Sequence, residues 1–285
     1  MSPARAGGAV LWFGRMAFSD PFVTPWRTAV VLDIALSEAE VQDAGEGVCG
    51  GRFVESAAFP GRQAYCKPWT IVGHHAAARE KIAGDLACDL SVNVPPVALV
   101  RWAGTGRPEQ VCLSLRMFPA QRPWAQAKYT LSGVAPSAVG QGKRLMDQAV
   151  ARAAARAFVF DTWVEQLDHE GPVGPSNILF GTEHDFSAGD FVFIDYEKSL
   201  FVGEKVKEPT KPAPFPFELR YRMDRAEASQ AVSDIEALPD DVIIEIVRRI
   251  PADFLPVDEA QRIQGRLIER KPELRTALAR HLEVR

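Results

Sequence analysis

Two carboxylates and an amide in the second half of the chain are of types that could hold a metal. The stretch QLDHEGPVGPSNILFG (166–181) carries Asp168 and Asn177 in a loop rich in glycine and proline, and FVFID (191–195) ends on Asp195. Mg²⁺ prefers oxygen ligands, so one Asn and one Asp suffice when phosphate oxygens and water complete its shell. Asp168 follows a long helical pattern and could instead orient a substrate hydroxyl and accept its proton.

A lysine and a glutamate earlier in the chain suit phosphate binding. Lys67 lies late in AYCKPW, after a Gly-rich turn region, and Glu80 lies in a segment rich in helix formers. A strand lysine directed by a glutamate on the packing helix is how protein kinases hold the ATP phosphates. Either residue alone is more simply a surface charge, but the ordered series of all five side chains favours phosphoryl transfer.

Hydrophobic patterns indicate the elements that must position these residues. β-branched runs bounded by glycine, proline or acidic residues predict strands at 27–36, 54–69 (two, around the turn FPGR), 93–102 and 109–118. Apolar residues at spacing four predict an amphipathic helix over 74–90 that carries Glu80. The longest helical pattern spans 141–167 and leads into the Asp168 loop. NILFG (177–181) and FVFID predict a hairpin that brings Asn177 and Asp195 to the same end.

The order of these elements predicts an α+β chain with the two lobes of a protein-kinase-like fold. We expect 1–44 to be an N-terminal extension with a strand, 45–118 a small, mainly β lobe with one helix, and 119–285 a larger, mainly helical lobe with a helical tail. Pro119, Pro123 and the residues between them are expected to form a linker, since proline interrupts regular structure.

Composition disfavours several classes of protein. The chain has 285 residues, 47% of them hydrophobic, which is enough for a sizeable core. The formal net charge of −4 gives no electrostatic reason to expect direct nucleic-acid binding. We find no apolar stretch of about 18 residues, no signal peptide and no CxxC pair among the four cysteines. We therefore expect a cytoplasmic protein with reduced thiols and no membrane span.

The motifs together resemble those of the HipA-like kinases, a bacterial branch of the protein-kinase-like fold related to phosphatidylinositol 3-/4-kinase catalytic domains. FDTWVEQLDHEGPVGPSNILF (160–180) is similar to the family pattern FDxWxxNxDRxxxNxNLL, and FIDYEKSL (193–200) is similar to its IDH or IDY. DLSVNVPPVALV (89–100) looks like the segment of type LGLPVPP that leads to the next strand. The resemblance covers the chain from about 45 to 200.

The resemblance implies an ATP- and Mg²⁺-dependent serine/threonine kinase that transfers the γ-phosphoryl group to a hydroxyl. It assigns ATP positioning to Lys67 and Glu80, catalysis to Asp168, and Mg²⁺ binding to Asn177 and Asp195. The implied partners are ATP, an unidentified protein or small-molecule phosphoacceptor, and an antitoxin or regulator of the kind that toxin-type family members have.

The resemblance also implies how the rest of the nucleotide is held. Its adenine hinge corresponds to LSLRMFP (113–119), with backbone contacts from Arg116, Met117 and Phe118, and its glycine-rich lid corresponds to GEGVCGGRF (45–53). Three departures from the pattern are Gln166 in place of Asn, His169 in place of Arg, and a longer loop between Asp168 and Asn177.

Two alternatives stay open, the first of them because of these departures. The first is a catalytically weak or inactive kinase-fold module for nucleotide binding or protein interaction. The second is a kinase for a small molecule or a lipid headgroup, although the acidic charge balance disfavours an anionic membrane surface.

Overall fold

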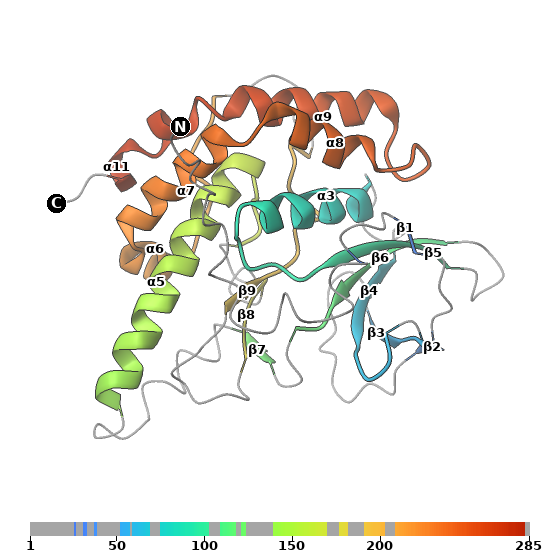
Figure 1. Cartoon of the computed structure of the whole chain (residues 1–285), viewed down its shortest axis with the longest axis horizontal. Coiled ribbons are helices and arrows are strands. Elements are labelled where there is room, and N and C mark those ends of the chain that lie inside the picture. Colours follow the sequence, from blue (N-terminus) through green and yellow to red (C-terminus); the bar gives the residue numbers. More distant parts are fainter. Residues whose placement is uncertain are drawn as a thin grey trace, which may run out of the picture.

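The computed structural model describes Trp26 and residues 31–32, 37–38, 52–57, 59–68, 75–102, 109–117, 121–123, 139–169, 177–181, 191–202 and 209–282. These residues form a six-stranded sheet, a smaller three-stranded sheet and a layer of helices (Figure 1). The chain is therefore an α+β protein with one small, mainly β lobe and one mainly helical lobe. Phe118 and most of the expected glycine-rich lid lie outside the described residues.

The larger sheet has the strand order β1-β5-β6-β4-β3-β2 and carries Lys67. Its strands are β1 (Val31–Leu32), β2 (Ser37–Glu38), β3 (Arg52–Glu55), β4 (Ala64–Pro68), β5 (Val97–Trp102) and β6 (Glu109–Leu115). Only β1 and β5 pair in parallel among these strands. The two strands expected around FPGR are confirmed as β3 and β4. Gly61 has φ +73° in the turn between them, a conformation that glycine adopts without a steric cost.

Alternation along the strands directs Lys67 to one face of this sheet. Neighbouring side chains of a strand point to opposite faces, whereas residues directly opposite each other on paired strands share a face. Lys67 lies opposite Cys112, which belongs to the core on the side of helix α3 (Ala76–Asp89). Cys66 instead joins the core on the other face, with Trp26 and Phe59. The lysine therefore points toward α3.

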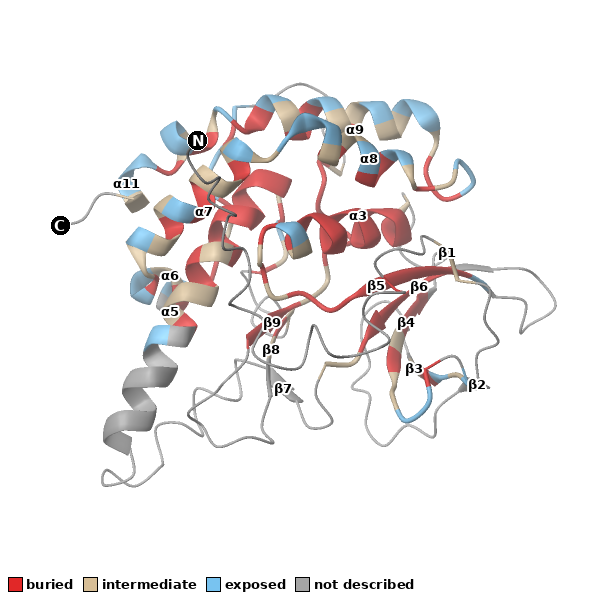
Figure 2. Cartoon of the chain, in the orientation of Figure 1, coloured by how far each residue is buried: buried red, intermediate tan, exposed pale blue. Residues whose placement is uncertain are grey.

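Helix α3 is confirmed within the expected range but is buried on nearly all sides. It lies between the larger sheet and the two helices α8 (Asp240–Arg248) and α9 (Val257–Arg270) (Figures 1 and 2). Every residue from Ala76 to Ala87 is buried, so the expected amphipathic character is wrong. The reason is that the sheet covers one side and the helical lobe covers the other. Gly84 permits the close approach, because a Cβ there would lie 3.2 Å from Val97 Cγ2.

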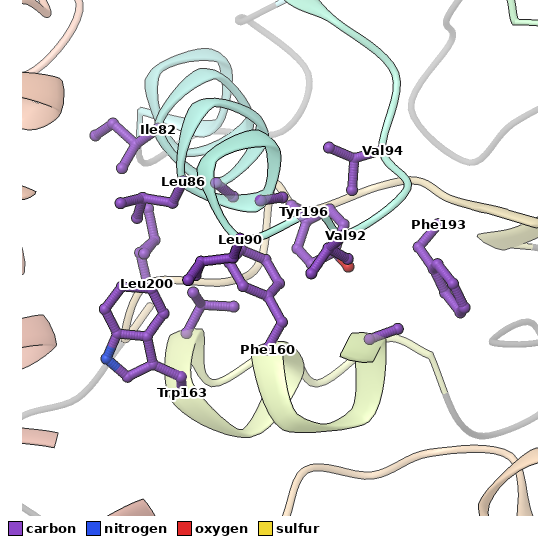
Figure 3. Close-up of a cluster of buried hydrophobic side chains, with 14 of the residues drawn as sticks. Ile82, Leu86, Leu90, Val92, Val94, Phe160, Trp163, Phe193, Tyr196 and Leu200 are labelled. Atoms are coloured by element: carbon purple, nitrogen blue, oxygen red, sulfur yellow. The ribbon is translucent and has the colours of Figure 1, made fainter. Parts of the chain in front are cut away.

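The helical lobe is built on one long helix that precedes Asp168. Its helices are α5 (Val139–Val164), α6 (Phe217–Arg222), α7 (Arg225–Ala237), α8, α9, α10 (Leu274–Ala277) and α11 (Ala279–Leu282). Asp224 caps α7 by accepting a hydrogen bond from the Glu227 N–H. Side chains of α3 and α5 meet in one apolar cluster, in which Leu86 and Leu90 lie near Phe160 and Trp163 (Figure 3). None of the described helices is long and apolar enough to span a membrane.

The smaller sheet positions the second half of the site. It has the order β7-β8-β9, with strands β7 (Gln121–Pro123), β8 (Ile178–Gly181) and β9 (Phe191–Phe193). The expected linker is wrong for 121–123, which pair with β8; as an edge strand, β7 tolerates a proline. The β8–β9 hairpin is confirmed, with Ile178 opposite Phe193. The Ile194 N–H donates to the Asn177 carbonyl at 2.9 Å, so Asn177, just before β8, and Asp195, just after β9, lie at the same end of the hairpin.

Candidate active site

Lys67 lies among three carboxylates that arrive from two separate parts of the chain. Its Nζ is 2.5 Å from Asp195 Oδ1, 3.2 Å from Glu197 Oε2 and 3.6 Å from Glu80 Oε2. The structure thus brings together Lys67, Glu80 and Asp195, although Lys67 and Asp195 are 128 residues apart in the sequence. Glu197 was missed as a site residue. Its signal was its position two residues after Asp195 in FIDYEKSL.

Burial and charge act against each other at these four side chains. Burial disfavours the charged lysine, but the carboxylates of Glu80, Asp195 and Glu197 outweigh it and raise the pKa of Lys67 well above its ordinary value. Burial raises the pKa of Glu80 to about 7 despite the attraction of Lys67. Burial also opposes ionisation of Asp195, yet the adjacent Lys67 ammonium lowers the pKa of this carboxyl. The cluster therefore holds one firm positive charge and an excess of acidic groups.

This excess fits a divalent cation. One oxygen from each of Glu80, Asp195 and Glu197 lies within 4.8 Å of the others. Glu80 Oε2 has no hydrogen-bond partner within the part of the chain that the structure describes. Hard cations such as Mg²⁺ bind carboxylate and amide oxygens, so the donor set suits the metal that the sequence predicts.

Gln166 connects the two aspartates of the site. Its Oε1 accepts hydrogen bonds from the Leu167 N–H at 2.9 Å and the Asp168 N–H at 3.3 Å, and its Nε2 donates to the Asp195 carbonyl at 2.7 Å. The side chain is fully buried. On the other side, Asn177 Nδ2 donates to the Asp168 carbonyl at 3.2 Å. The backbones of Asp168, Asn177 and Asp195 are therefore tied together by side-chain amides.

His169 is a buried cation between α5 and the Asp195 segment. Its Nδ1 is 2.6 Å from Asp161 Oδ2 and its Nε2 is 3.0 Å from the Ile194 carbonyl. Both partners are oxygen atoms, so a ring protonated on both nitrogens satisfies both contacts. Burial opposes this charge, but Asp161 outweighs it and raises the pKa of His169. Asp161 also accepts from the Tyr196 hydroxyl at 3.0 Å. A histidine thus supplies a positive charge where the family pattern has arginine.

Lys198 contacts the predicted catalytic carboxylate. Its Nζ donates to Asp168 Oδ2 at 2.6 Å, and its side chain is 54% exposed. Sequence patterns alone do not single out this residue, because a lysine after a strand is most simply a surface charge. Its only signal was its place immediately after Glu197.

The expected hinge begins within β6, and Arg116, the first of its predicted adenine contacts, already has other hydrogen-bond partners. The Arg116 N–H donates to the Gln63 carbonyl at 2.8 Å, and the Arg116 carbonyl accepts from Arg62 Nη2 at 3.3 Å. The Arg116 guanidinium lies over the Phe53 ring at 5.0 Å. Adenine contacts would therefore fall mainly to the following residues, of which Met117 is described.

One ion pair beside Glu80 fastens α3 to the helical lobe, and a second lies within α3 itself. Arg79 Nη1 donates to the Ser199 carbonyl at 3.0 Å and to the Leu200 carbonyl at 2.5 Å, and its Nη2 pairs with Glu259 of α9. One residue further, Lys81 pairs with Asp85 at 2.8 Å. Burial lowers the pKa of Arg79 to about 10, which Glu259 only partly offsets. The Glu80 backbone is thereby held between two anchored side chains.

A strand lysine among helix and hairpin carboxylates, with another aspartate after a long helix, defines a kinase-like architecture. The structure of CtkA, described as a proinflammatory kinase of Helicobacter pylori, is similar with a TM-score of 0.60 and 11% identity, over 90% of this chain and 99% of that chain. HipA of Shewanella oneidensis, solved with HipB and its operator DNA, is similar with a TM-score of 0.51 and 15% identity, over 89% of this chain and 67% of that chain.

The comparisons confirm the resemblance to HipA-like kinases at the level of the fold. At the level of sequence, no protein-family model matches this chain and no curated protein is similar to it.

Proposed function

We propose that this chain is an ATP- and Mg²⁺-dependent phosphotransferase that transfers the γ-phosphoryl group to a hydroxyl, with a protein serine or threonine as the acceptor. The observation that carries the proposal is the placement of Lys67 within ion-pair distance of both Glu80 and Asp195. These are the contacts that direct a phosphate-binding ammonium and place it next to a metal ligand.

The roles follow from position and charge. Lys67 binds phosphate oxygens, and Glu80 directs its ammonium. Asp168 orients the acceptor hydroxyl. The hydroxyl oxygen forms a bond to the γ-phosphorus while the bond to the bridging oxygen breaks, ADP leaves, and the hydroxyl proton passes to Asp168. Mg²⁺ would be held by Asn177 and Asp195, with Glu197 as a nearby oxygen donor, and when bound it neutralises phosphate charge.

An antitoxin or other regulator is a further proposed partner. The support is that the HipA structure contains HipB. We retain a small-molecule acceptor as an alternative to the protein hydroxyl, because Asp168 would orient the hydroxyl of either acceptor in the same way.

Two measurements test the proposal. Thermal stability with ATP and Mg²⁺ should rise for the wild type, and the rise should shrink for Asp195→Asn. Transfer of label from γ-labelled ATP, to the chain itself or to lysate proteins, should be lost in Asp168→Ala. Stabilisation without transfer under any divalent metal would identify a nucleotide-binding module instead. The absence of any nucleotide effect would contradict the proposal.

A further inference from the structure

The loop between the predicted base and the predicted metal ligand lacks a free-standing cation. Residues 169–176 read HEGPVGPS, with no lysine or arginine. His169, the one basic residue type in this stretch, is paired with Asp161. Phosphoryl transfer relies on positive groups placed around the transferred oxygens. The described residues offer one candidate beside Asp168, which is Lys198.

We infer that Lys198 contacts the transferring γ-phosphoryl group and so supplies, from the segment after Asp195, the cation that the loop lacks. The inference rests on the proposed function. Its geometric basis is the 2.6 Å contact between Lys198 Nζ and Asp168 Oδ2. An acceptor hydroxyl bound to Asp168 must lie against the γ-phosphorus, so an ammonium on the same carboxylate is one hydroxyl away from the transferred oxygens.

Burial gives the two lysines different places in the site. The Lys67 side chain is 9% exposed, whereas the Lys198 side chain is 54% exposed. Asp195 links the two lysines: it contacts Lys67 directly, and it precedes Lys198 by three residues in the sequence. Within the proposed site, Lys67 is therefore the enclosed cation and Lys198 the solvent-exposed one.

The backbone that carries Lys198 is fixed, which suits a residue that must meet a reacting group. The Ser199 N–H donates to the Tyr196 carbonyl at 3.0 Å, and the Leu200 N–H donates to the Val164 carbonyl of α5 at 2.7 Å. Arg79 donates to the Ser199 and Leu200 carbonyls. A site is better positioned by a held backbone than by a loose loop.

The protonation state of Lys198 is compatible with this role. The hydrogen bond with Asp168 raises the pKa of Lys198, outweighing a small opposing effect of burial, so the ammonium keeps its protons. During transfer the hydroxyl proton goes to Asp168. Lys198 donates hydrogen bonds to the γ-phosphoryl oxygens throughout and neither gains nor loses a proton.

The test compares Lys198→Ala with Lys198→Arg and with Lys211→Ala, a lysine whose side chain is also exposed but lies outside the site. In steady-state γ-phosphate transfer, Lys198→Ala should lower kcat about 10- to 100-fold with little change in KM for ATP. The loss is smaller than the roughly 100- to 1000-fold expected of an enclosed donor, because the ammonium is half-exposed. Lys198→Arg should recover part of kcat, and Lys211→Ala should match the wild type.

A binding measurement separates this inference from the proposed function. Wild type should bind the non-hydrolysable β,γ-imido analogue of ATP more tightly than ADP in the presence of Mg²⁺. Lys198→Ala should lose about 10-fold of that preference and keep its ADP affinity, since a charge-assisted hydrogen bond to the γ-phosphoryl group is gone. The preference can be measured in a protein that shows no transfer.

Each outcome tests either the Lys198 contact with the γ-phosphoryl group or the proposed transferase activity. An unchanged preference for the analogue in Lys198→Ala, or no preference in the wild type, overturns the role of Lys198. Loss of the preference without any transfer in the wild type supports the Lys198 contact and contradicts the transferase. A fall in ADP affinity and melting temperature alongside the preference would mean that Lys198 is merely structural, which also overturns the inference.

Discussion

Lys67 Nζ and Asp195 Oδ1 lie 2.5 Å apart, which joins the larger sheet to the segment that follows the smaller one. This pair sets the charge of the candidate active site, because Glu80 and Glu197 lie 3.6 Å and 3.2 Å from the same ammonium. Lys67, which we propose binds phosphate, and the predicted metal ligand Asp195 thus neutralise each other. ATP with Mg²⁺ would replace that pairing with phosphate oxygens for the lysine and a cation for the aspartate.

Lys67→Met should destabilise the fold as well as abolish nucleotide binding. It leaves three carboxylates in a buried site without their cation, and breaking a buried ion pair from one side costs about 3–5 kcal/mol. Urea unfolding at pH 7 measures the change in free energy. Adding Glu80→Gln to Lys67→Met should recover part of the loss by removing one carboxylate. No recovery would show that the acidic excess is not what destabilises the variant.

Gln166→Asn should lower transfer although it restores the residue of the family pattern. Asn is one methylene shorter and cannot reach both the Asp195 carbonyl and the backbone N–H groups of Leu167 and Asp168. A displacement of about 1 Å can cost about 100-fold in rate, so kcat should fall about 10- to 100-fold. Gln230→Asn, at an exposed glutamine on α7, is the matched control and should keep the wild-type rate.

His169→Gln should change stability in a pH-dependent way. The folded-state pKa of His169 is raised above 6.5 by Asp161, so its contribution to stability is complete below pH 6.5 and is lost as pH rises through the raised value. The difference in unfolding free energy between wild type and His169→Gln should therefore be largest near pH 6 and shrink toward alkaline pH. Urea titrations across that range measure it.

His281 provides a control of opposite sign for the same experiment. Partial burial, with Arg220 and Arg225 nearby, lowers the pKa of His281 below 6.5. The stability that it contributes is present above pH 6.5 and is lost as pH falls through the lowered value. His281→Gln should therefore lessen acid destabilisation. Parallel pH profiles for the two variants would contradict both assignments.

Arg79→Ala should cost far more than Arg262→Ala, although both arginines pair with Glu259. Arg79 is buried, and its loss leaves the Ser199 and Leu200 carbonyls without this donor, so we expect about 3 kcal/mol of destabilisation. The Arg262 pair with Glu259 is more exposed and contributes about 0–1 kcal/mol. Chemical unfolding compares them, and equal losses would show that the exposed and buried pairs contribute alike.

Local patterns predicted the elements of the site better than its surroundings. The hairpin and the helix with Glu80 follow from turn residues and periodicity within short windows. The approach of Lys67 to Glu80 was expected from their order along the chain and its likeness to protein kinases. The burial of α3 on both sides did not, because the charges of Arg79 and Lys81 look like a solvent face until their distant partners are known. Glu197 and Lys198 were not predicted as site residues for the same reason, because a charged residue after a strand is usually at the surface.

The core around α3 also determines how the protein should unfold on heating. A single apolar cluster contains Val97, Leu99 and Cys112 of the larger sheet together with α3, α5 and the later helices. The two lobes therefore have no separate interiors on this face of the sheet. Heating should produce one cooperative transition in which calorimetric and van't Hoff enthalpies agree, rather than a β lobe that melts before the helical one.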